Sequence, residues 1–307
     1  CAPDPWAEGR GYDLFRLSGS KTWNDYSNWY GKRPTDITLT VRATGTALAP
    51  QPVLTWDKTT TVNLWQYSCA GLPKYLKGTY NEAVYTVVET VPNGYSLASA
   101  TPAAGSVNGD GNVTGADFTN NIETVTLSGS KNWVDQSNIY SRRPTAITLT
   151  IRADGANITP YTDISWNKTA VPWTYSVADL PRYRAGTTTP IVYSVVETAI
   201  TDYTTTPSLT ATGSVNSTTG YITNANFTNT LATVSVSGKK TWQDQANYYG
   251  MRPDELHLTL LADGVALDPP PTPSWNKLSS TTEWTYTYAQ VPKYREDHVT
   301  AIVYTVL

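Results

Sequence analysis

The chain has 307 residues and a formal net charge of −3 at pH 7, which excludes the strongly basic surface that binds nucleic acids or anionic membranes. Charged residues make up only 15% of it, and 21 tyrosines and 11 tryptophans accompany many threonines, serines and valines. This composition favours strands and polar turns over helices. There is no run of 18 apolar residues that could span a bilayer, and no signal peptide or sorting motif. The chain therefore looks mature or shortened.

The first segment, residues 1–16, has no counterpart later in the chain and is left unassigned. Its Cys1 is either a lipidated mature N-terminus or the point at which a longer protein was cut. We favour the cut, because the other end of the chain also falls within a repeat.

From residue 17 onward, one block of about 110 residues occurs three times, which is the pattern of duplicated domains. Each copy opens with Ser-Gly-x-Lys-x-Trp-x-Asp, and an Arg-Pro pair follows about ten residues later. Because the spacing hardly changes between copies, we expect domains at residues 17–123, 124–232 and 233–307, the third truncated at its C-terminus. The copies follow one another almost without linkers, which favours a stiff rod.

Strand patterns recur at matching places in each copy. Runs such as Ile37–Val41 alternate with period two, which indicates one buried and one wet face. A Trp-x-Tyr strand follows, then a Val-Tyr-x-Val-Val-Glu strand that ends at Glu89 and Glu197, then a Phe-Thr-Asn strand that ends at Asn120 and Asn229. Short strands between Gly, Pro, Asn and Asp turns predict an all-β chain of tandem antiparallel β-sandwiches.

Taken in order, these motifs resemble the Cna B-type repeat, an immunoglobulin-like stalk module of Gram-positive collagen-binding adhesins and pilins. The resemblance covers nearly the whole chain after residue 17. It implies a spontaneous intramolecular isopeptide bond between a lysine of the first strand and an asparagine of the last, assisted by an acid on a middle strand. Carried over to this sequence, it predicts two complete sites, Lys21, Glu89 and Asn120 in the first copy and Lys131, Glu197 and Asn229 in the second. Lys240 belongs to a third, incomplete site, because the sequence stops at Leu307, one position before the expected acid.

The residue types suit this chemistry. A lysine amine is almost wholly protonated at neutral pH, so it attacks only where burial favours its neutral form. Burial also favours the protonated form of a carboxylic acid, which can polarise the asparagine carbonyl and carry protons while ammonia leaves. Glu89 and Glu197 would thus be catalytic only in self-crosslinking. Each domain reacts once, so we expect no enzyme activity on external substrates and no cofactor.

Other candidate sites are weak. Asn108–Asp117 has oxygen-bearing side chains at alternate positions, as a calcium loop does, but the second copy has no acid there. We therefore expect a hairpin turn and no metal site. The two histidines, His257 and His298, are too few for a catalytic triad or a histidine metal cluster. Two cysteines are too few for a disulfide framework, and Cys69 is expected to be an ordinary strand residue.

Pairs of large residues recur in the loop after the first strand of each copy, Trp29 with Tyr30, Ile139 with Tyr140, and Tyr248 with Tyr249, and all but Ile139 are aromatic. Exposed rings of this kind contact a ligand, or they pack where consecutive copies meet, which is the interpretation that we favour. In the first case, the chain would itself bind a carbohydrate or a matrix protein.

The sequence as a whole predicts the structural shaft of a bacterial adhesin or pilus-like protein, outside the cell and attached to its wall or envelope. Its partners would be the neighbouring domains of the same chain, with a host or environmental surface ligand bound by another region. Two alternatives stay open: a direct ligand-binding module that uses the aromatic loops, and an accessory array attached to a secreted enzyme.

Overall fold

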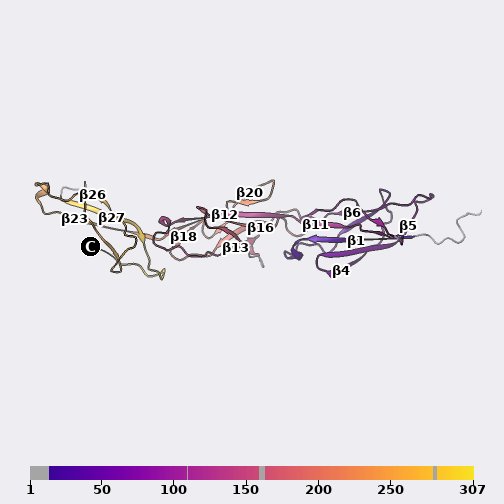
Figure 1. The fold of residues 1–307 in the computed structure, drawn as a ribbon, viewed down its shortest axis with the longest axis horizontal. Helices are drawn as coiled ribbons and strands as arrows, with labels where there is room; N and C mark the ends of the chain where they lie inside the picture. The colour runs from indigo at the N-terminus through magenta and orange to yellow at the C-terminus, as the bar shows by residue number, and fades with distance from the viewer. Residues whose placement is uncertain (1–13, 109, 159–162, 279–281) are drawn as a thin grey trace, which may run out of the picture. The chain divides into compact units, whose positions relative to one another are not determined.

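The structure is a computed structural model that describes residues 14–108, 110–158, 163–278 and 282–307. Its described elements are strands and three short 3-10 turns, η1 (Tyr26–Asn28), η2 (Gln136–Asn138) and η3 (Gln245–Asn247). The predicted all-β class is therefore confirmed (Figure 1). No helix in the described part of the chain is long and apolar enough to cross a membrane. Cys1 and most of the N-terminal segment lie outside the described residues.

Two sheets form the first copy. The larger consists of β4 (Thr55–Thr61), β5 (Leu64–Pro73), β1 (Leu14–Asn24), β10 (Val113–Thr114), β9 (Ser106–Val107), β11 (Phe118–Ile122) and β7 (Tyr95–Leu97). The smaller consists of β3 (Thr46–Ala47), β2 (Thr38–Ala43), β6 (Tyr85–Thr90) and β8 (Ala103–Ala104).

The second copy repeats this arrangement. Its larger sheet holds β15 (Ser165–Asn167), β16 (Trp173–Pro181), β12 (Thr124–Val134), β21 (Ile222–Thr223), β20 (Ser214–Val215), β22 (Phe227–Leu231) and β18 (Tyr203–Thr206). Its smaller sheet holds β14 (Ala156–Asn157), β13 (Leu149–Ala153), β17 (Tyr193–Glu197) and β19 (Thr210–Ala211). The third copy has two three-stranded sheets, β23 (Thr233–Thr241) with β27 (Glu283–Pro292) and β26 (Ser274–Asn276), and β25 (Val265–Ala266) with β24 (Leu260–Ala262) and β28 (Tyr304–Val306).

Packing divides the chain into two compact units, residues up to 125 with 178–191, and 126–177 with 192–307. Each sheet nevertheless draws its strands from one copy of the repeat. The strands break at residues 123 and 232, between β11 and β12 and between β22 and β23. These breaks coincide with the boundaries placed from the sequence, and the division into three domains stays a prediction.

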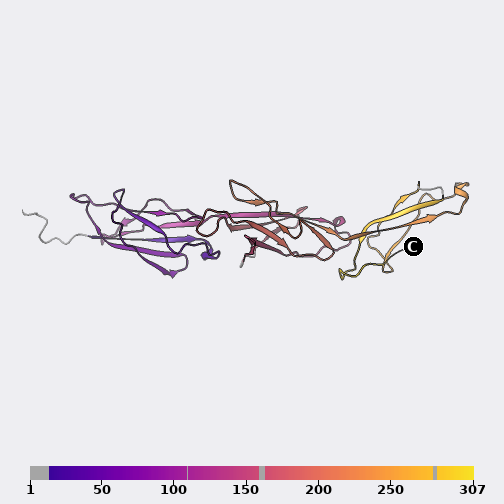
Figure 2. The same cartoon turned by 180° about the vertical axis from the view of Figure 1, so that it is seen from behind.

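The first and last strands of each complete copy pair in parallel, a detail that the sequence pattern did not predict. Figure 2 shows the chain from the side opposite to Figure 1. In the first copy, Lys21 pairs with Phe118, and Trp23 pairs with Asn120. Paired residues of parallel strands point to the same face of a sheet, so Lys21 and Asn120 are diagonal neighbours on the inner face. The second copy has the same register, with Lys131 opposite Phe227 and Trp133 opposite Asn229.

The core of the first copy is apolar. Leu17, Val41, Val87 and Phe118 are all 0% exposed and belong to one cluster. Burying a side chain of this size contributes roughly 1.5–3 kcal/mol relative to leaving it in water. Cys69 joins the same cluster from β5 with its thiol free, which confirms that it is an ordinary strand residue. Burial raises the pKa of this thiol.

The stretch that faintly resembles a calcium loop is a hairpin, as predicted. Strand β9, which precedes the stretch, pairs antiparallel with β10, which lies within it. The Asn108 Oδ1 atom accepts hydrogen bonds from the backbone N–H groups of Asp110 and Asn112. The oxygen of this side chain is therefore used to close the turn. Among the residues that the structure describes, no group of three or more His, Cys, Asp or Glu side chains could hold a metal ion.

Replacing Leu17 by Ala is expected to lower the free energy of opening of the β1–β5 pair by about 2 to 5 kcal/mol, because it empties a filled part of the core. Native-state hydrogen exchange of the β5 amides measures this quantity. Leu14→Ala, on the same strand but 54% exposed, is the matched control and is expected to change it little. Equal effects of the two variants would contradict the described packing.

Candidate functional site

The three side chains predicted for the first copy meet inside its sandwich. Lys21 comes from β1 and Asn120 from β11 of one sheet, and Glu89 comes from β6 of the other. The Lys21 Nζ atom lies 2.9 Å from Glu89 Oε2, and the Asn120 Nδ2 atom lies 2.9 Å from Glu89 Oε1. Lys21 and Asn120 are 0% exposed and Glu89 is 5% exposed. The carboxylate thus bridges the amine and the amide in a buried site.

The second copy builds the same site from its own strands. Lys131 lies on β12, Glu197 on β17 and Asn229 on β22. The Lys131 Nζ atom is 2.6 and 2.7 Å from the two Glu197 oxygens, and the Asn229 Nδ2 atom is 2.7 Å from Glu197 Oε1. All three side chains are buried. The structure therefore brings together all six residues predicted for the two complete sites.

Strand alternation explains how polar groups reach the core. On β6, Tyr85, Val87 and Glu89 are buried at every second position. On β11, Asn120 stands between the buried residues Phe118 and Ile122 in the same way. Because alternate side chains of a strand share a face, each polar residue occupies a position that the apolar pattern assigns to the interior.

Burial controls the protonation of the lysines. Desolvation lowers the pKa of Lys21 from 10.5 to about 8, and it outweighs the hydrogen bond and the charge of Glu89, which raise it. Desolvation lowers the pKa of Lys131 in the same way, again against the effect of Glu197. A proton can pass along each Lys–Glu hydrogen bond and leave a neutral amine beside a carboxylic acid. The nucleophile can therefore form without exchanging its proton with solvent.

The asparagine carbonyls are the unsatisfied part of both sites. Asn120 Oδ1 and Asn229 Oδ1 are buried and have no hydrogen-bond partner among the described residues, which costs about 1–3 kcal/mol for each group. Turning the Asn120 amide by a half-rotation would place its oxygen against Glu89, where a protonated acid donates to it. In that arrangement, a protonated acid would polarise the carbonyl carbon for attack by the lysine.

An indole ring forms another wall of the site. Lys21 Nζ lies 4.7 Å from the ring centroid of Trp23, and Arg33 Cζ lies 5.3 Å from the same ring. Arg33 pairs with Asp25, whose carboxylate also accepts hydrogen bonds from the Asn28 backbone N–H at 3.0 Å and from the Tyr95 hydroxyl at 3.0 Å. The ring that borders the amine is thereby fixed by a buried ion pair.

This supporting network was missed by the sequence reasoning. The second copy has Arg143 paired with Asp135, and the third has Arg252 paired with Asp244. The signal was present in the sequence, because the Trp-x-Asp and Arg-Pro motifs recur in all three copies. A charged pair that keeps a separation of eight residues indicates an ion pair, but nothing in a single copy shows that it supports a tryptophan.

In the third copy, Lys240 also lies over an indole ring, with its Nζ atom 5.3 Å from the ring centroid of Trp242. Lys240 itself is exposed. The given sequence contains neither the acid nor the asparagine of this site.

Several aromatic residues of the loops after the first strands are exposed. Trp29 is 50% exposed, and Tyr248 and Tyr249 are 77% and 73% exposed. The rings pack on one another in the first and third of these loops, Trp29 with Tyr30 and Tyr248 with Tyr249. Both interpretations of these loops, ligand contact and packing between copies, stay predictions.

The fold and the sites define a class of protein: a chain of repeated β-sandwich modules in which each complete copy encloses a lysine, an acid and an asparagine. The model of the Cna protein B-type domain matches residues 17–114, 127–225 and 236–307. The chain belongs to this family, which confirms the resemblance of its motifs.

Relatives of this chain come from Staphylococcus aureus. Its collagen adhesin is 30% identical over 288 residues, which cover 91% of this chain and 20% of the adhesin. Among solved structures, two B repeat units of the collagen binding protein match with 26% identity and a TM-score of 0.35, over 95% of this chain and 68% of that one. A single B repeat unit matches with 26% identity and a TM-score of 0.26, over 71% of this chain and 99% of that one. The chain thus spans about a fifth of the length of the curated relative.

A bond between Lys21 and Asn120, which the resemblance implies, would depend on pH through the proton that Lys21 and Glu89 share. The neutral amine with a protonated acid and the charged ion pair hold the same number of protons. The fraction of molecules in the neutral form is therefore independent of pH until the Lys–Glu pair loses one proton to solvent. In the first copy this loss follows the lowered pKa of Lys21, about 8. We expect the rate of Lys21–Asn120 bond formation to be level between pH 6.5 and pH 7.5 and to fall about tenfold by pH 9.

Chain purified in denaturant before it has folded, then diluted into buffers of different pH and sampled by mass spectrometry, gives this rate. A rate that instead rises through pH 8 would mean that the amine loses its proton to solvent and that the acid supplies none.

Proposed function

We propose that this chain is part of the shaft of a bacterial surface adhesin or pilus-like protein, and that its complete modules lock themselves with Lys21–Asn120 and Lys131–Asn229 isopeptide bonds. The observation that carries the proposal is the pair of buried clusters in which Glu89 or Glu197 bridges the amine and the amide. Membership of the Cna B-type family and the likeness to a collagen adhesin support an adhesin-related role on the outside of the cell.

The reaction balances within each site. The lysine Nζ atom attacks the asparagine Cγ atom, a new C–N bond forms, and the bond from Cγ to Nδ2 breaks. The glutamic acid takes a proton from the attacking nitrogen and gives one to the departing nitrogen, which leaves as ammonia. The acid ends as it began, but the lysine and asparagine are consumed. The protein is thus its own single-turnover substrate rather than an enzyme for other molecules.

The bond would close a ring of about 100 residues in each complete module. By analogy with a disulfide, a loop of this size removes roughly 4 to 5 kcal/mol of denatured-state entropy. A module so closed resists unfolding without a larger core or a metal ion. This property suits a shaft that must hold its form outside the cell.

A second candidate function is direct ligand binding by the aromatic loops. The exposed rings of Trp29, Tyr248 and Tyr249 favour it, because solvent-exposed aromatic side chains are common in contacts with other molecules. The shaft proposal expects that replacing all three by Ala leaves the retention of the chain on immobilised collagen unchanged. A loss of retention in this variant, with the fold intact by circular dichroism, would favour the binding module instead.

Intact mass tests the crosslinks. The folded chain is expected to weigh about 34 Da less than its sequence, a loss of two molecules of ammonia. Glu197→Ala is expected to keep only the loss of about 17 Da from the first copy. The matched control is Glu283→Ala, since this partly exposed glutamate pairs with Lys239 outside both sites. This variant is expected to form both bonds and to show the full loss of about 34 Da. A parent chain with its full sequence mass would refute the crosslinks.

A further inference from the structure

A tyrosine hydroxyl holds the chain just before the last strand of each complete copy. Tyr67 on β5 donates a hydrogen bond to the backbone carbonyl of Ala116, and Tyr175 on β16 donates one to the carbonyl of Ala225. Each tyrosine is only 2% exposed. Burial raises the pKa of both phenols well above its ordinary value, so the hydroxyl stays a donor. Each acceptor carbonyl lies two residues before its last strand, β11 or β22.

The first strand of the first copy also contacts the segment just before the last strand, at residues 116 and 117. The Ser20 backbone N–H donates to Asp117 Oδ1 at 2.7 Å, and the Ala116 N–H approaches the Ser18 carbonyl at 3.4 Å. Between these two serines, Gly19 permits the close approach, because a Cβ atom there would lie 2.1 Å from the Ala116 oxygen. We call the Tyr67 hydroxyl, Gly19 and the Ser20 N–H, with their partners on residues 116 and 117, the latch.

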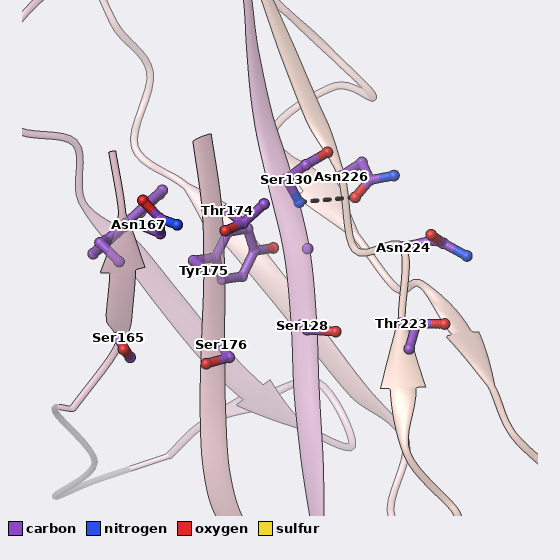
Figure 3. Close-up of a pocket in the computed structure, with 12 residues that line it drawn as sticks. Ser128, Ser130, Ser165, Asn167, Thr174, Tyr175, Ser176, Thr223, Asn224 and Asn226 are labelled. Atoms are coloured by element: carbon purple, nitrogen blue, oxygen red, sulfur yellow. Dashed lines mark hydrogen bonds between the residues drawn. The ribbon is translucent and has the colours of Figure 1, made fainter. Parts of the chain in front are cut away.

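The second copy has an equivalent latch (Figure 3). The Ser130 N–H donates to Asn226 Oδ1 at 2.8 Å, the dashed contact between β12 and the segment that leads into β22. A Cβ atom on Gly129 would lie 2.0 Å from the Ala225 oxygen. Aspartate in one copy and asparagine in the other supply the same acceptor atom. The two copies therefore share the hydrogen bond from the serine N–H to a side-chain oxygen, and not a negative charge.

The third copy has the same glycine and tyrosine. In the third copy, a Cβ atom on Gly238 would lie 2.4 Å from the Tyr286 hydroxyl oxygen, so the tyrosine and the glycine already face each other across β23 and β27. The first strand and its antiparallel neighbour therefore form the receiving side. The last strand completes the latch by supplying a carbonyl.

The latch matters because it fixes the register of the strand that carries the reacting asparagine. Asn120 follows Ala116 by four residues and pairs with Trp23. A slip of one residue would turn Asn120 to the outer face of the sheet. A slip of two would keep the face but move the side chain by about 6.6 Å along β1, beyond the 2.9 Å contact with Glu89.

We propose that Tyr67 and Tyr175 are positioning residues for isopeptide formation, which act by holding the last strand in the one register that places its asparagine beside the lysine. This inference rests on the proposed crosslinking, and neither hydroxyl touches the reacting atoms. The lysine, glutamate and asparagine would then be insufficient for bond formation on their own. The reaction would also depend on the tyrosine of β5 or β16 that holds the chain before the last strand.

Tyr67→Phe removes only the hydroxyl. Refolded from denaturant, this variant of the full chain is expected to form the first-copy bond about five to ten times more slowly than the parent, the effect of losing one buried hydrogen bond. The control is Tyr85→Phe, since Tyr85 is 3% exposed and also donates to a backbone carbonyl, that of Pro73 at 2.7 Å, away from the last strand. The rate at which the second-copy bond forms in the same molecule is the internal reference. Equal rates for the two variants, or no change with Tyr67→Phe, would overturn the proposal.

A second measurement separates this inference from the crosslinking itself. In a Lys21→Met background, where no first-copy bond can form, Tyr67→Phe is expected to speed hydrogen exchange of the β11 amides several-fold more than Tyr85→Phe does. If the parent chain forms no bond at all, the proposed function is refuted, and this exchange comparison still decides whether the latch holds the strand. Exchange that is the same in both variants would show that it does not.

Discussion

A lysine hydrogen-bonded to a glutamate in an apolar core is the interaction on which the rest of each complete module depends. Removing two charges from water costs several kcal/mol, which their attraction only partly offsets. In the proposed reaction, amide formation would remove this cost, because it would replace the buried ammonium of Lys21 by a neutral group. The packing that makes the pair costly to keep is the same packing that lowers the pKa of the amine.

The surrounding structure keeps these reactive groups in place. On one side, the Asp25–Arg33 pair fixes the Trp23 ring that borders the amine. On the other side, the tyrosine latch fixes the strand that brings the amide. The two supports come from different segments, one from the loop after the first strand and one from the segment before the last. Each complete module would thus position the proposed nucleophile and acceptor separately, and the acid from the facing sheet contacts both.

The alternation of apolar residues predicted the sandwich because it leaves a periodic trace, and the resemblance to the Cna B-type repeat implied the six site residues. Glu89 and Asn120 sit at inward positions of alternating strands, and they recur in the second copy at the same spacing. The parallel pairing of first and last strands left no such trace, because alternation is the same for either strand direction. The latch was equally hidden, since the acceptor for Tyr67 is a backbone carbonyl and any residue type could supply it.

The parallel pairing also determines how a single module bears a pulling force. Because β1 and β11 run in the same direction, a chain pulled at the start of one strand and the end of the other loads their hydrogen bonds in shear, all at once, and does not peel them one by one. With Lys21 joined to Asn120, tension would enter along β1, cross the side-chain amide and leave after Ile122. The roughly 100 residues between those two positions would carry no load, so a module could be strained without becoming longer.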